Sequence, residues 1–120
     1  MSDFKQLSRS VQGLTALVTG AASGMGRATA RVFAAEGANV AVTDFNHEGA
    51  RAVTEEIAAN GGSAGAWRLD VANRDEIGSV VNDVADHFGG LDIIINNAGI
   101  SVRVAIDDDG YDEAWQRDWR

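Results

Sequence analysis

The 120-residue sequence contains no cysteine and no proline, and Lys5 is its only lysine. Without cysteine, the chain can form neither a disulfide nor a thiolate metal site. No apolar run approaches the ~20 residues that a membrane-spanning helix needs. The polar N-terminal stretch MSDFKQLSRS also lacks the apolar centre of a signal peptide. We therefore expect a cytoplasmic protein without a membrane partner.

Basic residues are also few: the sequence has 10 lysines and arginines and 18 acidic residues, which gives a net charge of −8. This excess of negative charge argues against nucleic acids and anionic membrane surfaces as partners. An acidic cluster at residues 107–113 lacks the ligand spacing of a calcium loop, so we interpret it as solvated charge. His47 and His87 are interpreted as surface residues. We expect no metal site.

The sequence does contain a regular alternation of short apolar runs and longer segments with helical periodicity. Strands are predicted at residues 14–19, 38–44, 63–70 and 91–95. Helices are predicted after the glycine-rich stretch 19–26, at 47–60 and at 73–88, where Asn73 and Glu76 form a variant of the capping box. The predicted apolar helix faces are Ala28, Val32 and Ala35; Ala50, Val53 and Ile57; and Ile77, Val80, Val81, Val84 and Phe88.

This βαβαβαβ order predicts a parallel sheet with right-handed crossover connections. We expect an α/β fold with a Rossmann-like, doubly wound sheet in the spatial strand order 3-2-1-4. Residues 1–10 are expected to be an N-terminal leader, and residues 11–120 a single dinucleotide-binding domain.

The stretch TGAASGMG, residues 19–26, is the first candidate site. It follows a buried strand, opens a helix, and spaces its glycines as G-x-x-x-G-x-G. Glycine allows the backbone to turn sharply and to approach a ligand closely. The free N–H groups and the dipole at a helix start favour a phosphate. An ordinary strand-to-helix turn would also explain the glycines, but the position within a βαβ unit favours dinucleotide binding.

Polar residues also follow the other predicted strands. Asp44 ends the second strand, where a carboxylate accepts hydrogen bonds from ribose hydroxyls and repels a 2′-phosphate. Because Phe45 and not an arginine follows it, we predict NAD as the cofactor in preference to NADP. A turn-forming aspartate is the alternative. Asp70 ends the third strand and NNAG, residues 96–99, ends the fourth, so all of these features should meet at one edge of the sheet.

In combination, these motifs resemble the short-chain dehydrogenase/reductase family from about residue 11 to the end of the chain. The resemblance implies a Rossmann fold, an NAD(P) cofactor and hydride transfer between the nicotinamide and an alcohol or carbonyl. It also implies a structural role for Asn96. The cofactor-binding residues that it implies are Gly20, Ser23, Gly24, Met25 and Gly26 at the pyrophosphate, Asp44 and Phe45 at the adenosine ribose, Asp70 and Val71 at the adenine, and Asn97, Ala98 and Gly99 at a cofactor ribose.

The family's catalytic serine and Tyr-x-x-x-Lys pair have no counterpart in these 120 residues. The position four residues after Tyr111 holds Trp115, and Lys5 precedes the first strand. We therefore predict no catalytic residue here, and we expect a chain truncated after the fourth strand and the start of the next helix. Such a chain would hold the adenosine half of the cofactor site and be inactive alone. An alcohol or carbonyl substrate would require the missing half.

Two alternatives stay open. The chain could be a non-catalytic dinucleotide-binding module, or an interaction protein that reuses the fold. Truncation would also leave the apolar segment Leu91–Ile95 as an uncovered sheet edge, which invites pairing with another chain. We therefore expect either marginal folding or a homo-oligomer formed through this edge.

Overall fold

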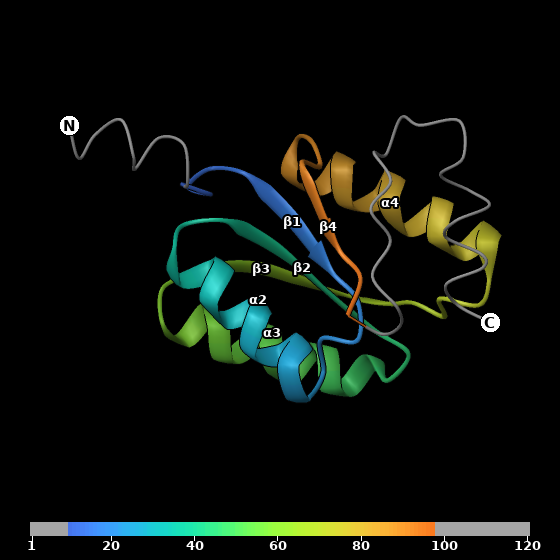
Figure 1. Cartoon of the computed structure of the whole chain (residues 1–120), viewed down its shortest axis with the longest axis horizontal. Helices are drawn as coiled ribbons and strands as arrows, with labels where there is room; N and C mark the ends of the chain where they lie inside the picture. Colours follow the sequence, from blue (N-terminus) through green and yellow to red (C-terminus); the bar gives the residue numbers. More distant parts are fainter. Residues whose placement is uncertain (1–9, 98–120) are drawn as a thin grey trace.

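The computed structural model describes residues 10–97, which form a four-stranded parallel sheet with helices on both faces (Figure 1). The strand order is β3-β2-β1-β4, which confirms the predicted fold class and topology. No helix in this part of the chain is long and apolar enough to cross a membrane. The elements are β1 (Thr15–Val18), α2 (Gly24–Ala35), β2 (Asn39–Asp44), α3 (His47–Ala59), β3 (Ser63–Arg68), α4 (Arg74–Phe88) and β4 (Ile93–Ile95).

The central strands are buried on both faces, because α2 and α3 cover one face of the sheet and α4 covers the other (Figure 1). Alternate side chains of a strand point to opposite faces. Val18 and Val42 accordingly join the core beneath α2 and α3, whereas Leu17 and Ala41 join the core beneath α4. This double burial explains why the first two strands appear in the sequence as continuous apolar runs.

Two of the three predicted helix faces are confirmed. The buried residues of α3 are Ala50, Val53 and Ile57, as its periodicity predicts. In α4, the predicted stripe also faces the sheet, with three residues buried and Val81 and Phe88 packed against them. In both helices apolar side chains recur every three or four residues and so lie on one face, and this local periodicity is enough to predict which face is buried.

The predicted face of α2 is wrong. The residues that α2 buries are Gly26, Ala30 and Ala34, and Val32 is 59% exposed. The three buried residues follow one another at four-residue spacing, and their small size lets the helix lie close to the sheet. The face that α2 turns toward the sheet is therefore formed by Gly26, Ala30 and Ala34, with Phe33 packed beside them and Val32 turned outward.

The connection from β3 to α4 also differs in detail from the prediction. The third strand ends at Arg68, and Asp70 lies in the turn that follows it. Asn73 caps α4 by accepting a hydrogen bond from the Glu76 N–H at 3.1 Å, as predicted. The Glu76 carboxylate does not return to Asn73 but accepts from the Asp70 N–H at 2.9 Å. The predicted capping box is thus only half formed, and Glu76 fixes the preceding turn instead.

Candidate functional site

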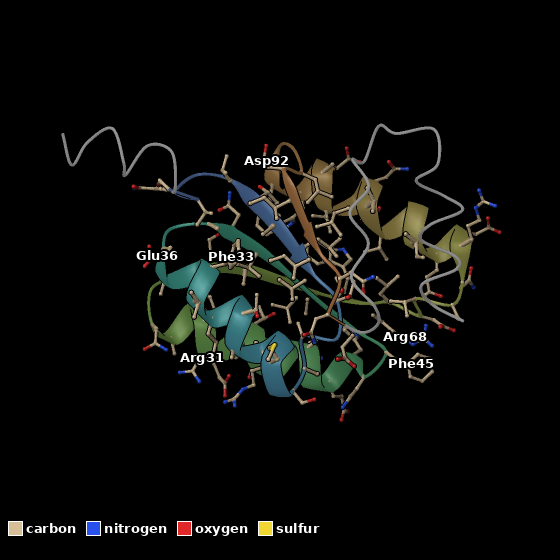
Figure 2. The ribbon with its side chains drawn as sticks, in the orientation of Figure 1. Arg31, Phe33, Glu36, Phe45, Arg68 and Asp92 are labelled. Carbon is tan, nitrogen blue, oxygen red and sulfur yellow. The ribbon has the colours of Figure 1, made fainter. Side chains whose placement is uncertain are left out.

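The carboxyl ends of the four parallel strands meet at one edge of the sheet, which brings together the four loops that the sequence singles out. Figure 2 shows Phe45 and Arg68 at this edge and Asp92 and Glu36 toward the opposite end. In open α/β sheets, ligands bind beyond the carboxyl ends of the strands. The candidate residues within the described range therefore share one location, whereas Ala98 and Gly99 lie outside it.

The three glycines of the first loop have different structural roles. Gly20 and Gly24 have φ angles of 60° and 59°, in the left-handed region that glycine adopts without steric cost. Gly26 has an ordinary helical backbone, but a Cβ added there would lie 2.1 Å from the Gly20 carbonyl oxygen. Gly20 and Gly24 thus shape the turn, and Gly26 lets the helix start lie directly on it.

The N-terminus of α2 differs from those of the other two helices. Asn46 and Asn73 cap α3 and α4, and both helices have acidic residues in their first turns. Ser23 occupies the N-cap position of α2, but its side chain makes no capping hydrogen bond, and the first turn contains no acidic residue. The first N–H groups of a helix lack helical partners and carry partial positive charge. Among residues 10–97, α2 therefore has the helix start best suited to an anion.

Asp44 ties this loop to the next helix. Its Oδ2 accepts a hydrogen bond from the Ala22 N–H at 3.0 Å, and its Oδ1 accepts from the Asn46 N–H at 2.9 Å. The second bond is the turn-forming role that the sequence left open as an alternative. An ionised carboxylate has about four acceptor positions, so two bonds leave capacity for ribose hydroxyls. The structural role and the proposed binding role are compatible.

Asn97 connects the end of β4 to the glycine loop. Its N–H donates to the Thr19 hydroxyl at 3.0 Å, and its Nδ2 donates to the Gly20 carbonyl at 3.3 Å. The Thr19 N–H in turn donates to the Ile95 carbonyl at 3.0 Å. The Asn97 side chain, which the sequence assigned to a cofactor ribose, is therefore engaged in holding β1, β4 and the loop together.

Asp70 and Val71 lie in the turn between β3 and α4. The Asp70 Oδ1 accepts a hydrogen bond from the Ala72 N–H at 3.0 Å, and Val71 packs against the core beneath α4. Both residues are half-buried and lie after the strand that neighbours β2. The structure thus places them at the same edge as Asp44.

Arg68 is a residue of this edge that was not predicted from the sequence. It is in register with Asp44 on the neighbouring strand, and its Cζ lies 4.5 Å from the centroid of the Phe45 ring. Its Nη1 pairs with the Glu76 Oε1 at 3.1 Å. The prediction of NAD rested on Asp44, on Phe45 in place of an arginine after it, and on the absence of a lysine nearby in the sequence. Aligning the ends of the second and third predicted strands would have brought Arg68 into consideration.

The other candidate features of residues 10–97 lie away from this edge or lack chemistry. No group of three metal-ligating side chains is present in this range. His87 is exposed and makes edge-on contacts with Trp67 and Phe88. An open groove of about 760 Å³ lies between the C-terminal halves of α2 and α3, at the other end of the sheet. Tyr111, Trp115, Lys5 and the acidic cluster at 107–113 lie outside the described residues.

Known proteins are similar to this chain in both sequence and fold. The family model described as short chain dehydrogenase matches residues 14–118. The chain is 46% identical over 90 residues to a 2,5-dichloro-2,5-cyclohexadiene-1,4-diol dehydrogenase of Sphingobium indicum, covering 75% of this chain and 35% of that protein. It is 37% identical over 113 residues to a cyclohexanol dehydrogenase of an Acinetobacter species, covering 94% of this chain and 45% of that protein.

Solved structures give the same result. A hydroxysteroid dehydrogenase from Escherichia coli matches with a TM-score of 0.73 and 36% identity, over 81% of this chain and 41% of that one. A metagenomic short-chain oxidoreductase in complex with NADP matches with a TM-score of 0.71 and 40% identity, over 76% and 41% of the two chains. The chain thus spans between a third and a half of the length of these relatives, and it belongs to the short-chain dehydrogenase/reductase family.

Proposed function

We propose that this chain binds an NAD(P) dinucleotide at the carboxyl edge of its sheet, as part of an oxidoreductase that transfers a hydride to or from an alcohol or carbonyl. The observation that carries this proposal is the start of α2, where Gly20 before the helix and Gly24 at its first position have positive φ, and the helix N-terminus has neither a side-chain cap nor an acidic residue. That combination leaves backbone N–H groups and partial positive charge for a pyrophosphate.

Each part of the edge has a role in this proposal. The backbone around Gly20, Ser23, Gly24, Met25 and Gly26 would hold the pyrophosphate. Asp44 would accept from the adenosine ribose hydroxyls, and its charge would disfavour a 2′-phosphate, which supports a preference for NAD. Phe45 would lie beside the same ribose, and Asp70 and Val71 would lie beside the adenine. The nicotinamide supplies the hydride chemistry when the cofactor is bound. The residues of this chain would bind and orient the adenosine end of the dinucleotide.

The chain is proposed to bind the cofactor without turning over substrate by itself. The positions that would carry the family's acid/base chemistry are not matched, because Trp115 stands four residues after Tyr111 and Lys5 is the only lysine. Loss of a tuned general acid/base costs about 10²- to 10⁴-fold in rate. Residues 11–120 would then form the cofactor-binding part of the family's domain, preceded by a leader at 1–10. A non-catalytic dinucleotide-binding module is the second candidate that fits the same geometry.

Isothermal titration of the 120-residue chain tests the binding proposal. NAD and ADP-ribose should bind with similar affinity. Nicotinamide mononucleotide should bind more weakly than either, because it keeps one phosphate but lacks the adenosine that Asp44, Asp70 and Val71 would contact. Absence of binding of NAD and ADP-ribose up to millimolar ligand would contradict the proposal and leave either an interaction protein or an unfolded chain.

A charge placed at the start of α2 separates binding from folding. Met25 is 76% exposed in the first turn of α2, so Met25→Glu should stabilise the helix by about 0.3–1 kcal/mol through the dipole. The same charge should weaken ADP-ribose binding by repelling the pyrophosphate. Met25→Gln is the matched control, with a side chain of the same length as Glu and no charge. Equal affinity in the two variants would argue against an anion site at this helix start.

A further inference from the structure

Arg68 lies beside Asp44 but does not pair with it. The two residues are in register at the ends of adjacent parallel strands, and the following N–H, from Leu69, donates to the Asp44 carbonyl at 2.9 Å. Within residues 10–97, however, the ion pair of Arg68 is with Glu76 on α4. A cation thus lies next to the carboxylate that is proposed to bind the adenosine ribose, but it forms its ion pair with Glu76.

Two contacts hold the Arg68 guanidinium. Its Cζ lies 4.5 Å from the centroid of the Phe45 ring (Figure 2). Its Nη1 lies 3.1 Å from the Glu76 Oε1. Glu76 is itself fixed, because the same Oε1 accepts from the Asp70 N–H at 2.9 Å. The Glu76 side chain is 25% exposed and that of Arg68 is 47% exposed. The carboxylate is therefore the anchored partner, and the guanidinium is the one that can move.

We propose that Glu76 is a positioning residue that sets the cofactor preference of this edge by holding Arg68 away from the ribose. A free guanidinium beside the ribose would bind a 2′-phosphate through paired hydrogen bonds. Held by Glu76 and stacked on Phe45, Arg68 has its charge balanced, and its Nη1 donates to a carboxylate. The inference rests on the proposed function. It adds a second determinant of the preference for NAD: besides the repulsion by Asp44, no free cation is available to bind a 2′-phosphate.

The restraint on Arg68 can be released by one substitution. Ion pairs between partly exposed side chains are weak, so the loss of the Glu76 charge frees the guanidinium at little cost to the fold. Glu76→Gln keeps a side-chain oxygen that can accept from the Asp70 N–H. The neighbouring Asp75 provides a matched control, because it is an exposed acid in the same first turn of α4 and has no ion pair with Arg68.

The experiment compares two probes that differ only in the 2′-phosphate, adenosine 5′-monophosphate and adenosine 2′,5′-bisphosphate, by titration of the 120-residue chain. Glu76→Gln should raise the affinity for the bisphosphate relative to the monophosphate by about three- to tenfold, as expected for a new charge-assisted contact at a partly exposed site. The rise should be absent in the Glu76→Gln/Arg68→Gln double variant. Asp75→Asn should leave the ratio at its wild-type value.

A second route to the same release guards against misfolding of the first variant. Phe45→Leu removes the stacking contact and should raise the same affinity ratio by a smaller factor, with any general loss of adenosine binding cancelling between the probes. Folding of each variant is checked by circular dichroism and thermal unfolding.

The outcomes separate this inference from the proposal on which it rests. If the wild-type chain binds neither NAD nor the monophosphate, the proposed function fails and the inference fails with it. If both bind and Glu76→Gln leaves the ratio unchanged, only the inference is wrong. An equal rise in Asp75→Asn, or a rise that survives in the double variant, would also overturn it, because Arg68 would then not be the partner of the phosphate.

Discussion

Glycines that look equivalent in the sequence carry different constraints in the fold. Gly24 has a φ of 59° and open space where a Cβ would lie, whereas Gly26 has helical geometry and no space. Gly78, in the middle of α4, has helical geometry and nothing within 4 Å of the Cβ position. The sequence motif identifies Gly26 as part of the loop, but only its neighbours show why a side chain is excluded.

Substitution of Gly26 by alanine should therefore destabilise the protein. The new Cβ would lie 2.1 Å from the Gly20 oxygen and 2.6 Å from the Asn97 Nδ2, so the loop must shift. We expect a loss of about 1–3 kcal/mol in the free energy of unfolding, measured with urea, together with weaker ADP-ribose binding. Gly78→Ala is the control and should gain up to about 1 kcal/mol from helix propensity. Equal stability of the two variants would show that the close approach at Gly26 is wrong.

Asp44 combines a structural and a proposed binding role, which one variant can separate with the right control. Asp44→Ala removes two backbone hydrogen bonds and should cost about 1–3 kcal/mol in stability. It should also narrow the difference in affinity between NAD and NADP, measured by titration, because a charge that repels the 2′-phosphate is lost.

Asp92 provides the control for Asp44. Its Oδ2 accepts from the Thr15 N–H at 2.8 Å toward the opposite end of the sheet, away from the candidate site (Figure 2). Asp92→Ala should destabilise the chain by a similar mechanism and leave the NAD to NADP ratio unchanged. A ratio that is unaffected by Asp44→Ala would count against the ribose-binding role.

Helices α2 and α3, which cover the same face of the sheet, are joined by an ion pair between Arg27 and Glu56. The Arg27 Nε donates to the Glu56 Oε1 at 3.0 Å, and Nη2 bonds the second carboxylate oxygen. The hydrogen bond from Arg27 lowers the pKa of the Glu56 carboxyl below its ordinary value, against an opposing effect of partial desolvation. The same contact raises the pKa of Arg27. The pair links the outer sides of α2 and α3.

This ion pair should contribute to the dependence of stability on pH. A carboxyl whose pKa is lowered by folding stabilises the protein above its unfolded pKa, and this contribution is lost as the pH falls through the folded value. The free energy of unfolding should therefore decline more between about pH 6 and about pH 3 in the wild-type chain than in Glu56→Gln. Glu55→Gln, an exposed neighbour without an ion pair in residues 10–97, should decline like the wild type. Parallel curves for wild type and Glu56→Gln would argue against this role.

Two separate cores on opposite faces of one sheet hold residues 10–97 together. One lies beneath α2 and α3 and includes Val53, and the other lies beneath α4 and includes Val84. Because β1 and β2 contribute side chains to both, loss of either core exposes the strands that support the other. Unfolding should accordingly occur in a single transition. The predicted self-association through Leu91–Ile95 stays a prediction, and β4 is the outer strand of the described sheet.

The two cores should be energetically independent at the level of single side chains. Val53→Ala and Val84→Ala each remove buried methyl groups and should each cost about 1–3 kcal/mol. Since the sheet separates the two sites, the double variant should equal the sum within about 0.5 kcal/mol in urea unfolding. A larger interaction energy between the two substitutions would contradict the independence of the two cores. Two transitions in urea unfolding would contradict their sharing of one sheet.

Features that depend on neighbouring residues in the chain could be read from the sequence. The strand and helix order, the buried faces of α3 and α4, the cap at Asn73 and the glycine loop are all encoded in local patterns of a few residues. The helix periodicity and the apolar runs depend on which side of an element meets the core, and that is a local property.

The tertiary structure decided the features that depend on segments far apart in the chain. Strand register places Arg68 beside Asp44, packing closes the space at Gly26, and the Asn97 amide is used to hold the glycine loop. None of these follows from a local pattern: other elements separate Asp44 from Arg68 and Gly20 from Asn97, and the space at Gly26 is closed by Asn97 as well as by Gly20 of its own loop. The sequence therefore identified the edge of the sheet as the candidate site, and the register of β2 and β3 decided that Arg68 lies beside Asp44 there.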